Sequence, residues 1–193
     1  LRDASEIEKD TNKMGKPSEE IGVSHSHRAV FLDRDGVINQ SIVRNGESCP
    51  PWSLDEFEIL PGVAEACTKL KQAGYALVVA TNQPDVGRGV ILQNTVEEIH
   101  SLMIKELPID QVEVCYHPGR NMSDCDCRKP RPGMLLRAAK KFGIDLKQSW
   151  MVGDRMTDIE CGRAAGCRTI LVGDGGASDL FEAVTTILDS DRL

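Results

Sequence analysis

The sequence predicts a three-layer α/β/α sandwich built around a mainly parallel β-sheet. Short apolar runs alternate with segments of helical periodicity from residue 28 to the C-terminus, and polar residues follow several of the apolar runs. Strands that alternate with helices pair in parallel through right-handed crossovers, which place helices on both faces of the sheet. Ligands of such folds collect at the carboxyl ends of the strands.

Five apolar runs are expected to form the strands of this sheet. The first, RAVFL, is continuously apolar apart from its first residue, as in a strand buried on both faces. The predicted strands are residues 28–36, 75–83, 111–117, 149–154 and 167–175.

Five segments with helical spacing follow these strands. The first begins at Pro61 and ends at Gly74, residues that favour a helix start and a helix end. The predicted helices are residues 61–74, 91–107, 133–143, 156–166 and 178–190. The insertion between Asp33 and Pro61 is too short for a full cap domain, so only a minimal cap is expected.

The length of 193 residues suits one well-buried domain and is short for two. We assign that domain to residues 28–193. Residues 1–27 are polar and lack periodicity, which predicts a flexible N-terminal extension.

The net charge of −7 argues against nucleic acid or an anionic membrane surface as a partner. No apolar run reaches the roughly 18 residues of a membrane span, and no signal segment is recognised. The expected location is therefore the cytoplasm. A monomer is expected. A negatively charged chain binds an anionic small molecule only through a local cluster of cations or a metal.

Aspartates stand at the ends of two predicted strands. Asp33 and Asp35 in DRDG are two positions apart, so an extended backbone points both to the same side. Two adjacent carboxylates repel each other unless a cation lies between them or one is protonated. A turn with solvated acids is the alternative. Asp154 in VGDRMTD could complete a Mg²⁺ site, with Asp158 either supporting its ligands or favouring the helix start.

Cysteines are concentrated between residues 115 and 127. Three thiols and one imidazole, which are Zn²⁺ ligand types, form a tetrahedral set without an open position: Cys115, His117, Cys125 and Cys127. A disulfide is disfavoured by the expected compartment, and coincidence by the density of ligands. The loop PGRNMSD is almost devoid of apolar residues, so a structural zinc clip would fix Arg128 and Lys129.

The chain resembles the haloacid-dehalogenase superfamily of phosphohydrolases from Arg28 onward. Its four motifs occur in order as VFLDRDG, VVATNQ, RKPRPG and MVGDRMTD. The resemblance implies a Rossmann-like sandwich in which Asp33 is the nucleophile and Asp35 the general acid and base. It also implies that Thr81 and Lys129 hold the phosphoryl oxygens. Mg²⁺ would be bound by Asp33, the backbone carbonyl of Asp35 and Asp154.

The Cys-His-Cys-Cys clip before RKP is similar to that of two branches, the D,D-heptose 1,7-bisphosphate 7-phosphatases and the histidinol-phosphate phosphatases. RKPRPGML and TNQPDVGRG favour the heptose branch. The chain departs from that branch in a shorter zinc loop and in Pro84-Asp85-Val86, where Ser-Gly-Ile is usual.

The resemblance also implies a small phosphorylated sugar as substrate. Carried over by position, the substrate contacts would be Ser41, Ile42, Val43, Arg44, Asn82, Gln83, Arg128 and Arg155. Histidinol phosphate or another small sugar phosphate is the alternative substrate. A non-catalytic zinc-binding module is the alternative class, but it leaves DRDG, the strand-end threonine and GDRMTD unexplained.

Overall fold

The computed structural model describes residues 28–119 and 125–192. Its central sheet has five strands in the order β5-β4-β1-β6-β7, and every neighbouring pair is parallel. The strands are β1 (Ala29–Leu32), β4 (Ala76–Asn82), β5 (Gln111–Cys115), β6 (Trp150–Gly153) and β7 (Arg168–Leu171). All five predicted strands and their parallel pairing are confirmed.

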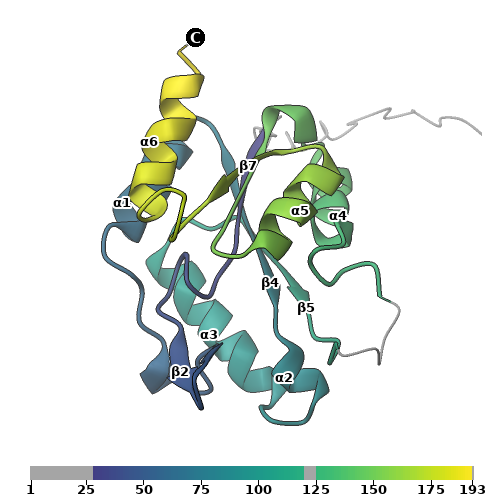
Figure 1. Cartoon of the computed structure of the whole chain (residues 1–193). Coiled ribbons are helices and arrows are strands. Elements are labelled where there is room, and N and C mark those ends of the chain that lie inside the picture. Colours follow the sequence, from purple (N-terminus) through teal and green to yellow (C-terminus); the bar gives the residue numbers. More distant parts are fainter. Residues whose placement is uncertain (1–27, 120–124, 193) are drawn as a thin grey trace, which may run out of the picture.

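Helices cover both faces of the sheet (Figure 1). One face packs against α1 (Val63–Gln72), α3 (Gln93–Glu106) and α6 (Leu180–Ser190). The other packs against α4 (Gly133–Phe142) and α5 (Met156–Ala165). The predicted three-layer sandwich is therefore confirmed.

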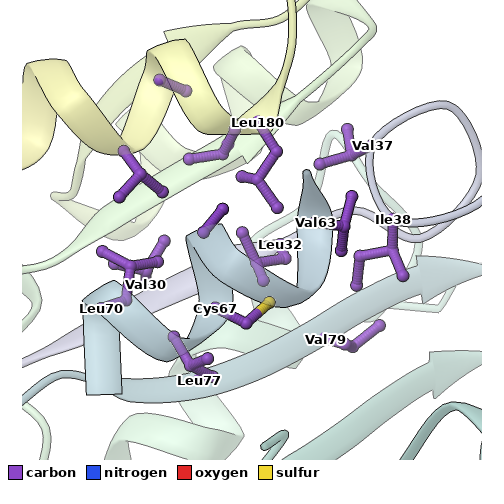
Figure 2. Packing of buried hydrophobic residues seen from close by; sticks show 14 of the residues in the cluster. Val30, Leu32, Val37, Ile38, Val63, Cys67, Leu70, Leu77, Val79 and Leu180 are labelled. Carbon is purple, nitrogen blue, oxygen red and sulfur yellow. The ribbon is translucent and has the colours of Figure 1, made fainter. Parts of the chain in front are cut away.

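Strand β1 contributes alternately to the two apolar layers. Val30 and Leu32 lie in the cluster beneath α1 and α6, where Figure 2 shows them beside Cys67 and Leu70. Phe31 lies in the cluster on the opposite face. This alternation follows from the two-residue period of a strand, and it explains why the run is apolar throughout.

The connection from β1 to α1 forms a small hairpin in place of a cap domain. It consists of β2 (Ile42–Arg44) and β3 (Glu47–Cys49), followed by the short helix η1 (Leu54–Glu56). Two further short helices, α2 (Pro84–Gly87) and η2 (Leu146–Gln148), lie between longer elements. None of these short elements is evident from apolar periodicity.

Two sequence expectations fall outside the described residues: the flexible extension of residues 1–27 and the middle of the cysteine loop, residues 120–124. Among the helices in the described ranges, none combines the length and apolarity that crossing a membrane requires.

The parallel sheet brings the carboxyl ends of its strands to one edge. Asp33 follows β1 directly, and its backbone N–H donates to the carbonyl of Val152 in β6. On the other side of β1, Asn82 at the end of β4 is in register with Cys115 at the end of β5. Three predicted motifs therefore meet at this edge.

Candidate active site and metal centres

A pocket of about 410 Å³ lies at the carboxyl edge of the sheet. Both acids of DRDG line it, together with four cations and the second strand of the hairpin. The charged lining residues are Asp33, Asp35, Glu47, Asp85, Arg88, Arg128, Lys129, Arg155 and Asp158. A pocket with this many cations can hold a strongly anionic ligand in an acidic protein.

Lys129 is only 4% exposed and its ammonium group contacts three oxygens. The Nζ atom donates to Asp33 Oδ1 at 2.6 Å and to the carbonyl of Ala80 at 2.7 Å. It also lies 2.6 Å from Asp158 Oδ1. The ammonium group therefore joins the ends of β1 and β4 to the start of α5.

The acids around Lys129 carry more charge than one lysine neutralises. Burial raises the pKa of Asp33 to about 7, against the attraction of Lys129 and with added repulsion from Asp158 and Asp35. Burial likewise raises the pKa of Asp154 above its ordinary value. Burial alone would lower the pKa of Lys129, but Asp33 and Asp158 outweigh it and raise that pKa. A further cation would relieve this excess of negative charge.

The geometry of these acids suits a divalent cation. One carboxylate oxygen from each of Asp33, Asp154 and Asp158 lies within 4.8 Å of the others. Within the described part of the chain, the buried Asp154 Oδ1 has no hydrogen-bond partner. Hard carboxylate oxygens are the ligands that Mg²⁺ prefers. The carboxylate of Asp35 is engaged elsewhere, which leaves only its backbone carbonyl for a metal.

Two glycines make this close approach of acids possible. A Cβ atom on Gly36 would lie 2.3 Å from Asp154 Oδ2, and one on Gly153 would lie 2.1 Å from Asp158 Cβ. Gly36 also has a φ of +95°, a conformation that other residues rarely adopt. The absence of a side chain at Gly36 thus lets the Asp154 carboxylate lie against the end of β1. The absence of one at Gly153 lets Asp158 lie against the end of β6.

The carboxylate of Asp35 is held by neutral and cationic donors. Arg34 Nη2 donates to both of its oxygens, at 3.0 and 3.1 Å. Asn39 Nδ2 donates to Oδ1 at 3.0 Å and Gln83 Nε2 to Oδ2 at 2.8 Å. The side chain still lines the pocket and is 12% exposed. Asp33 and Asp35 therefore face the same pocket from different environments.

The predicted zinc ligands converge as expected. One atom from each of Cys115, His117, Cys125 and Cys127 lies within 4.8 Å of the others. His117 Nδ1 is 3.5 Å from Cys115 Sγ and 3.3 Å from Cys127 Sγ, and Cys115 Sγ is 3.9 Å from Cys125 Sγ. Tetrahedral bonds of roughly 2.0–2.3 Å to Zn²⁺ would separate the ligand atoms by roughly 3.5–3.8 Å. The four residues thus match a closed structural zinc site.

The clip connects directly to Lys129. Cys115 is the last residue of β5, beside Asn82 of β4. Asn82 Oδ1 accepts from the backbone N–H of Lys129 at 3.1 Å, and its Nδ2 donates to the Lys129 carbonyl at 3.2 Å. The cysteine cluster and Asn82 therefore fix the backbone from which the ammonium group enters the pocket.

The predicted substrate contacts divide into three groups. Asn82, Arg128 and Arg155 line the pocket. Gln83 is buried beside it, and its Nε2 donates at 2.9 Å to Oγ1 of Thr81, the buried threonine predicted to hold phosphoryl oxygens. Residues 41–44 are absent from its lining, and the hairpin contributes residues 47–50 instead. Arg44 packs over the ring of Trp52 at 4.0 Å, outside the pocket.

The rim of the pocket is held by contacts that the sequence did not indicate. Asp85 is 8% exposed and accepts from Trp52 Nε1 at 3.1 Å and from Arg88 Nη1 at 3.2 Å. Arg88 Nε also donates to the carbonyl of Pro118 at 3.0 Å. The segment between β3 and η1, helix α2 and the cysteine loop are thereby linked. The departure at Pro84-Asp85-Val86 was the available signal for this linkage.

Arg34 and His100 are the other residues that the sequence analysis left unassigned. Apolar periodicity does not predict that either side chain is buried, yet Arg34 is 0% and His100 6% exposed. Their side chains contact each other across 66 positions of sequence, at 2.9 Å between Arg34 Nη1 and His100 Nε2.

Comparisons with known proteins agree with this geometry. The HAD-hydrolase-like family model matches residues 126–187. The D-glycero-β-D-manno-heptose-1,7-bisphosphate 7-phosphatase of Pasteurella multocida is 39% identical over 158 residues, covering 77% of this chain and 83% of the relative. The enzyme of the same name from Escherichia coli K12 is also 39% identical over 158 residues, covering 76% and 80%.

Solved structures show the same relationship. The D,D-heptose 1,7-bisphosphate phosphatase from B. bronchiseptica, complexed with magnesium and phosphate, has a TM-score of 0.73 and 31% identity, covering 84% of this chain and 99% of that one. A HAD-like phosphatase from Mesorhizobium loti has a TM-score of 0.64 and 28% identity, with coverages of 82% and 86%. With its motifs brought to one sheet edge and its relatives matched over most of their length, the chain belongs to the D-glycero-β-D-manno-heptose-1,7-bisphosphate 7-phosphatase family of HAD-like hydrolases.

Proposed function

We propose that this chain is a Mg²⁺-dependent phosphatase that removes the C7 phosphate of D-glycero-D-manno-heptose 1,7-bisphosphate. The observation that carries the proposal is the contact of Asp33 with Lys129 beside Asp154 and Asp158, in a pocket that Asp35 also lines. A carboxylate nucleophile, a fixed cation and a second carboxyl group are the parts that a covalent phosphoryl transfer requires.

The proposed reaction has two steps. A carboxylate oxygen of Asp33 attacks phosphorus, the bond to the sugar oxygen breaks, and Asp35 gives a proton to the departing alkoxide. Asp35 then takes a proton from water, which attacks the aspartyl-phosphate and releases phosphate. Lys129 and Thr81 hold the phosphoryl oxygens during both steps. Mg²⁺ bound by Asp33, the Asp35 carbonyl and Asp154 would neutralise charge on the transferring group.

The rest of the pocket favours a substrate with a second anionic group. Arg128 and Arg155 line the pocket beyond Lys129. Among the described residues, no group hydrogen-bonds the buried Arg128 Nη1. A guanidinium group pairs well with a second phosphate. Histidinol phosphate would instead bring a cationic amine toward these arginines, which disfavours it.

The compartment and the assembly stay predictions. None of the seven cysteines, which all lie in the described residues, forms a disulfide, and this agrees with a reducing compartment such as the cytoplasm. We expect a monomer whose partner is the small phosphorylated sugar alone.

Substitution of the two aspartates tests the assigned roles. Asp33→Asn should abolish turnover and the formation of a covalent phosphate, because the nucleophile is lost. Asp35→Asn should slow turnover by roughly 10²–10⁴-fold while phosphate still binds, because only proton transfer is impaired. Steady-state rates and acid-quenched labelling with a radioactive substrate measure both effects. Near-normal activity of Asp33→Asn would exclude the covalent mechanism.

The pKa of Asp33 predicts how Mg²⁺ binding depends on pH. Folding raises this pKa from 3.8 to about 7, so protein freed of divalent cations binds an extra proton when folded and loses stability as pH rises across that interval. Mg²⁺ competes with this proton. The rise in melting temperature caused by Mg²⁺ should therefore be larger at about pH 8 than at about pH 5. Asp33→Asn, measured in parallel, should show a smaller difference, because only the proton on Asp154 still competes with Mg²⁺. Equal stabilisation by Mg²⁺ at both pH values would contradict the assignment of Asp33 as a Mg²⁺ ligand with a raised pKa.

Substrate competition tests the proposed specificity. The heptose 1,7-bisphosphate should be hydrolysed at C7 with a kcat/KM at least roughly 10²-fold above that of histidinol phosphate, since only the bisphosphate engages the arginines. Arg128→Gln should reduce this preference, whereas Arg137→Gln, outside the pocket, should leave it intact. Phosphate release measures the rates. The reverse ranking would assign the chain to the histidinol branch.

Removal of one clip ligand tests the role of the zinc site. The protein should hold about one Zn²⁺ per chain. Cys125→Ser should release it and lower kcat/KM by roughly 10²-fold, because Arg128 and Lys129 lose their fixed position. The core should stay folded, and added Mg²⁺ should not restore activity. Cys167→Ser, which changes a thiol outside the clip, should retain zinc. Metal analysis measures the zinc content and steady-state kinetics measure kcat/KM. Full activity of Cys125→Ser would refute the proposal that zinc fixes the position of Arg128 and Lys129.

A further inference from the structure

A buried arginine that does not line the pocket donates hydrogen bonds to the carboxylate of Asp35. Arg34 is 0% exposed, although it lies between the two aspartates of DRDG. Besides the two contacts of Nη2, its Nε donates to Asp35 Oδ1 at 3.2 Å. Arg34 therefore makes three hydrogen bonds to the Asp35 carboxylate, against one each from Asn39 and Gln83, and contributes most to its orientation.

The remaining nitrogen of this guanidinium group, Nη1, contacts His100 on α3. Arg34 Nη1 lies 2.9 Å from His100 Nε2. Because a guanidinium group only donates, Nε2 must be the acceptor, which places the imidazole proton on Nδ1. Burial, followed by the charge of Arg34, lowers the pKa of His100 to about 3, so the imidazole stays neutral at working pH. The contact is therefore a charge-assisted hydrogen bond.

We propose that His100 is a positioning residue: its neutral imidazole anchors Arg34, and Arg34 in turn aims Asp35 at the leaving group. His100 does not line the pocket, so it acts only through Arg34. Without the acceptor on α3, one end of the guanidinium group loses its fixed partner while buried. The Asp35 carboxylate would then move with it. A shift of about 1 Å in such a group can cost roughly 10²-fold in rate.

This inference rests on the proposed function, in which Asp35 protonates the leaving alkoxide. The readout should therefore depend on the leaving group. A sugar alkoxide needs that proton, whereas p-nitrophenolate is weakly basic and departs without it. The parameter kcat/KM reports the steps up to leaving-group departure, so it excludes the later attack of water. A general structural defect would lower kcat/KM for both substrates alike.

The experiment compares His100→Leu with His100→Gln. In His100→Leu, kcat/KM for heptose 1,7-bisphosphate should fall at least roughly tenfold more than kcat/KM for p-nitrophenyl phosphate. The loss should lie in kcat, with the inhibition constant for inorganic phosphate unchanged. In His100→Gln, an amide oxygen can accept from Arg34, so most of the loss should be recovered.

Met103→Ala is the matched control, because Met103 lies on the same helix and is fully buried without contacting Arg34 in any hydrogen bond. It should lower the melting temperature without changing the ratio of the two kcat/KM values. If His100→Leu is folded and keeps the wild-type ratio, the inference is overturned. The same holds if Met103→Ala changes the ratio as much as His100→Leu does.

A measurement without turnover separates this inference from the proposed function. In the wild-type protein, ¹⁵N shifts of the His100 ring should show a neutral imidazole with the proton on Nδ1. A proton on Nε2, or a charged ring at neutral pH, would exclude the hydrogen bond even if the enzyme is active. If heptose bisphosphate is not hydrolysed but the ring has the expected tautomer, the substrate assignment fails while the Arg34–His100 contact stands.

Discussion

The ammonium group of Lys129 lies 2.6 Å from Asp33 and 2.6 Å from Asp158, inside a protein whose net charge is negative. A buried cation of this kind is costly unless every proton has a partner, and the Ala80 carbonyl provides the third. Asp154 adds a further carboxylate: its Oδ2 lies 3.9 Å from Arg155 Nε, while its buried Oδ1 has no hydrogen-bond partner among the described residues. The edge of the sheet is thus organised around one lysine and a surplus of acid, an arrangement that favours a metal and an anionic substrate together.

The fold supplies the geometry that this charge cluster requires. Parallel strands bring Asp33, Asn82 and Asp154 to one edge, and Gly36 and Gly153 remove the side chains that would keep the acids apart. The lysine itself comes from the segment after the cysteine cluster, two residues beyond its last cysteine. Asn82 and the four ligands of the clip fix that segment from the neighbouring strand end. A zinc ion bound by the cysteine cluster would thereby support the proposed Mg²⁺ site.

The two aspartates of DRDG illustrate how environment divides chemical roles. Asp33 faces Lys129 and the other acids, where burial raises its pKa and a cation is needed. Asp35 faces Arg34, Asn39 and Gln83, which hold its carboxylate by hydrogen bonds. The first environment suits a metal-bound nucleophile and the second a group that exchanges protons, as expected when neighbouring carboxyl groups perform different tasks.

The sequence by itself determined the parallel α/β sandwich, the strand-end motifs and the four cysteine and histidine residues that converge in one cluster. Apolar periodicity, the order of the motifs and the density of thiols are local properties, so they can be read without coordinates. Burial of Arg34 against His100, and the contact of Trp52 with Asp85, depend on residues 66 and 33 positions apart. Periodicity likewise could not show that residues 47–50, rather than 41–44, line the pocket. Only the packed structure decided these contacts, because a side chain's partners across the chain are set by how whole elements meet and not by the residues beside it.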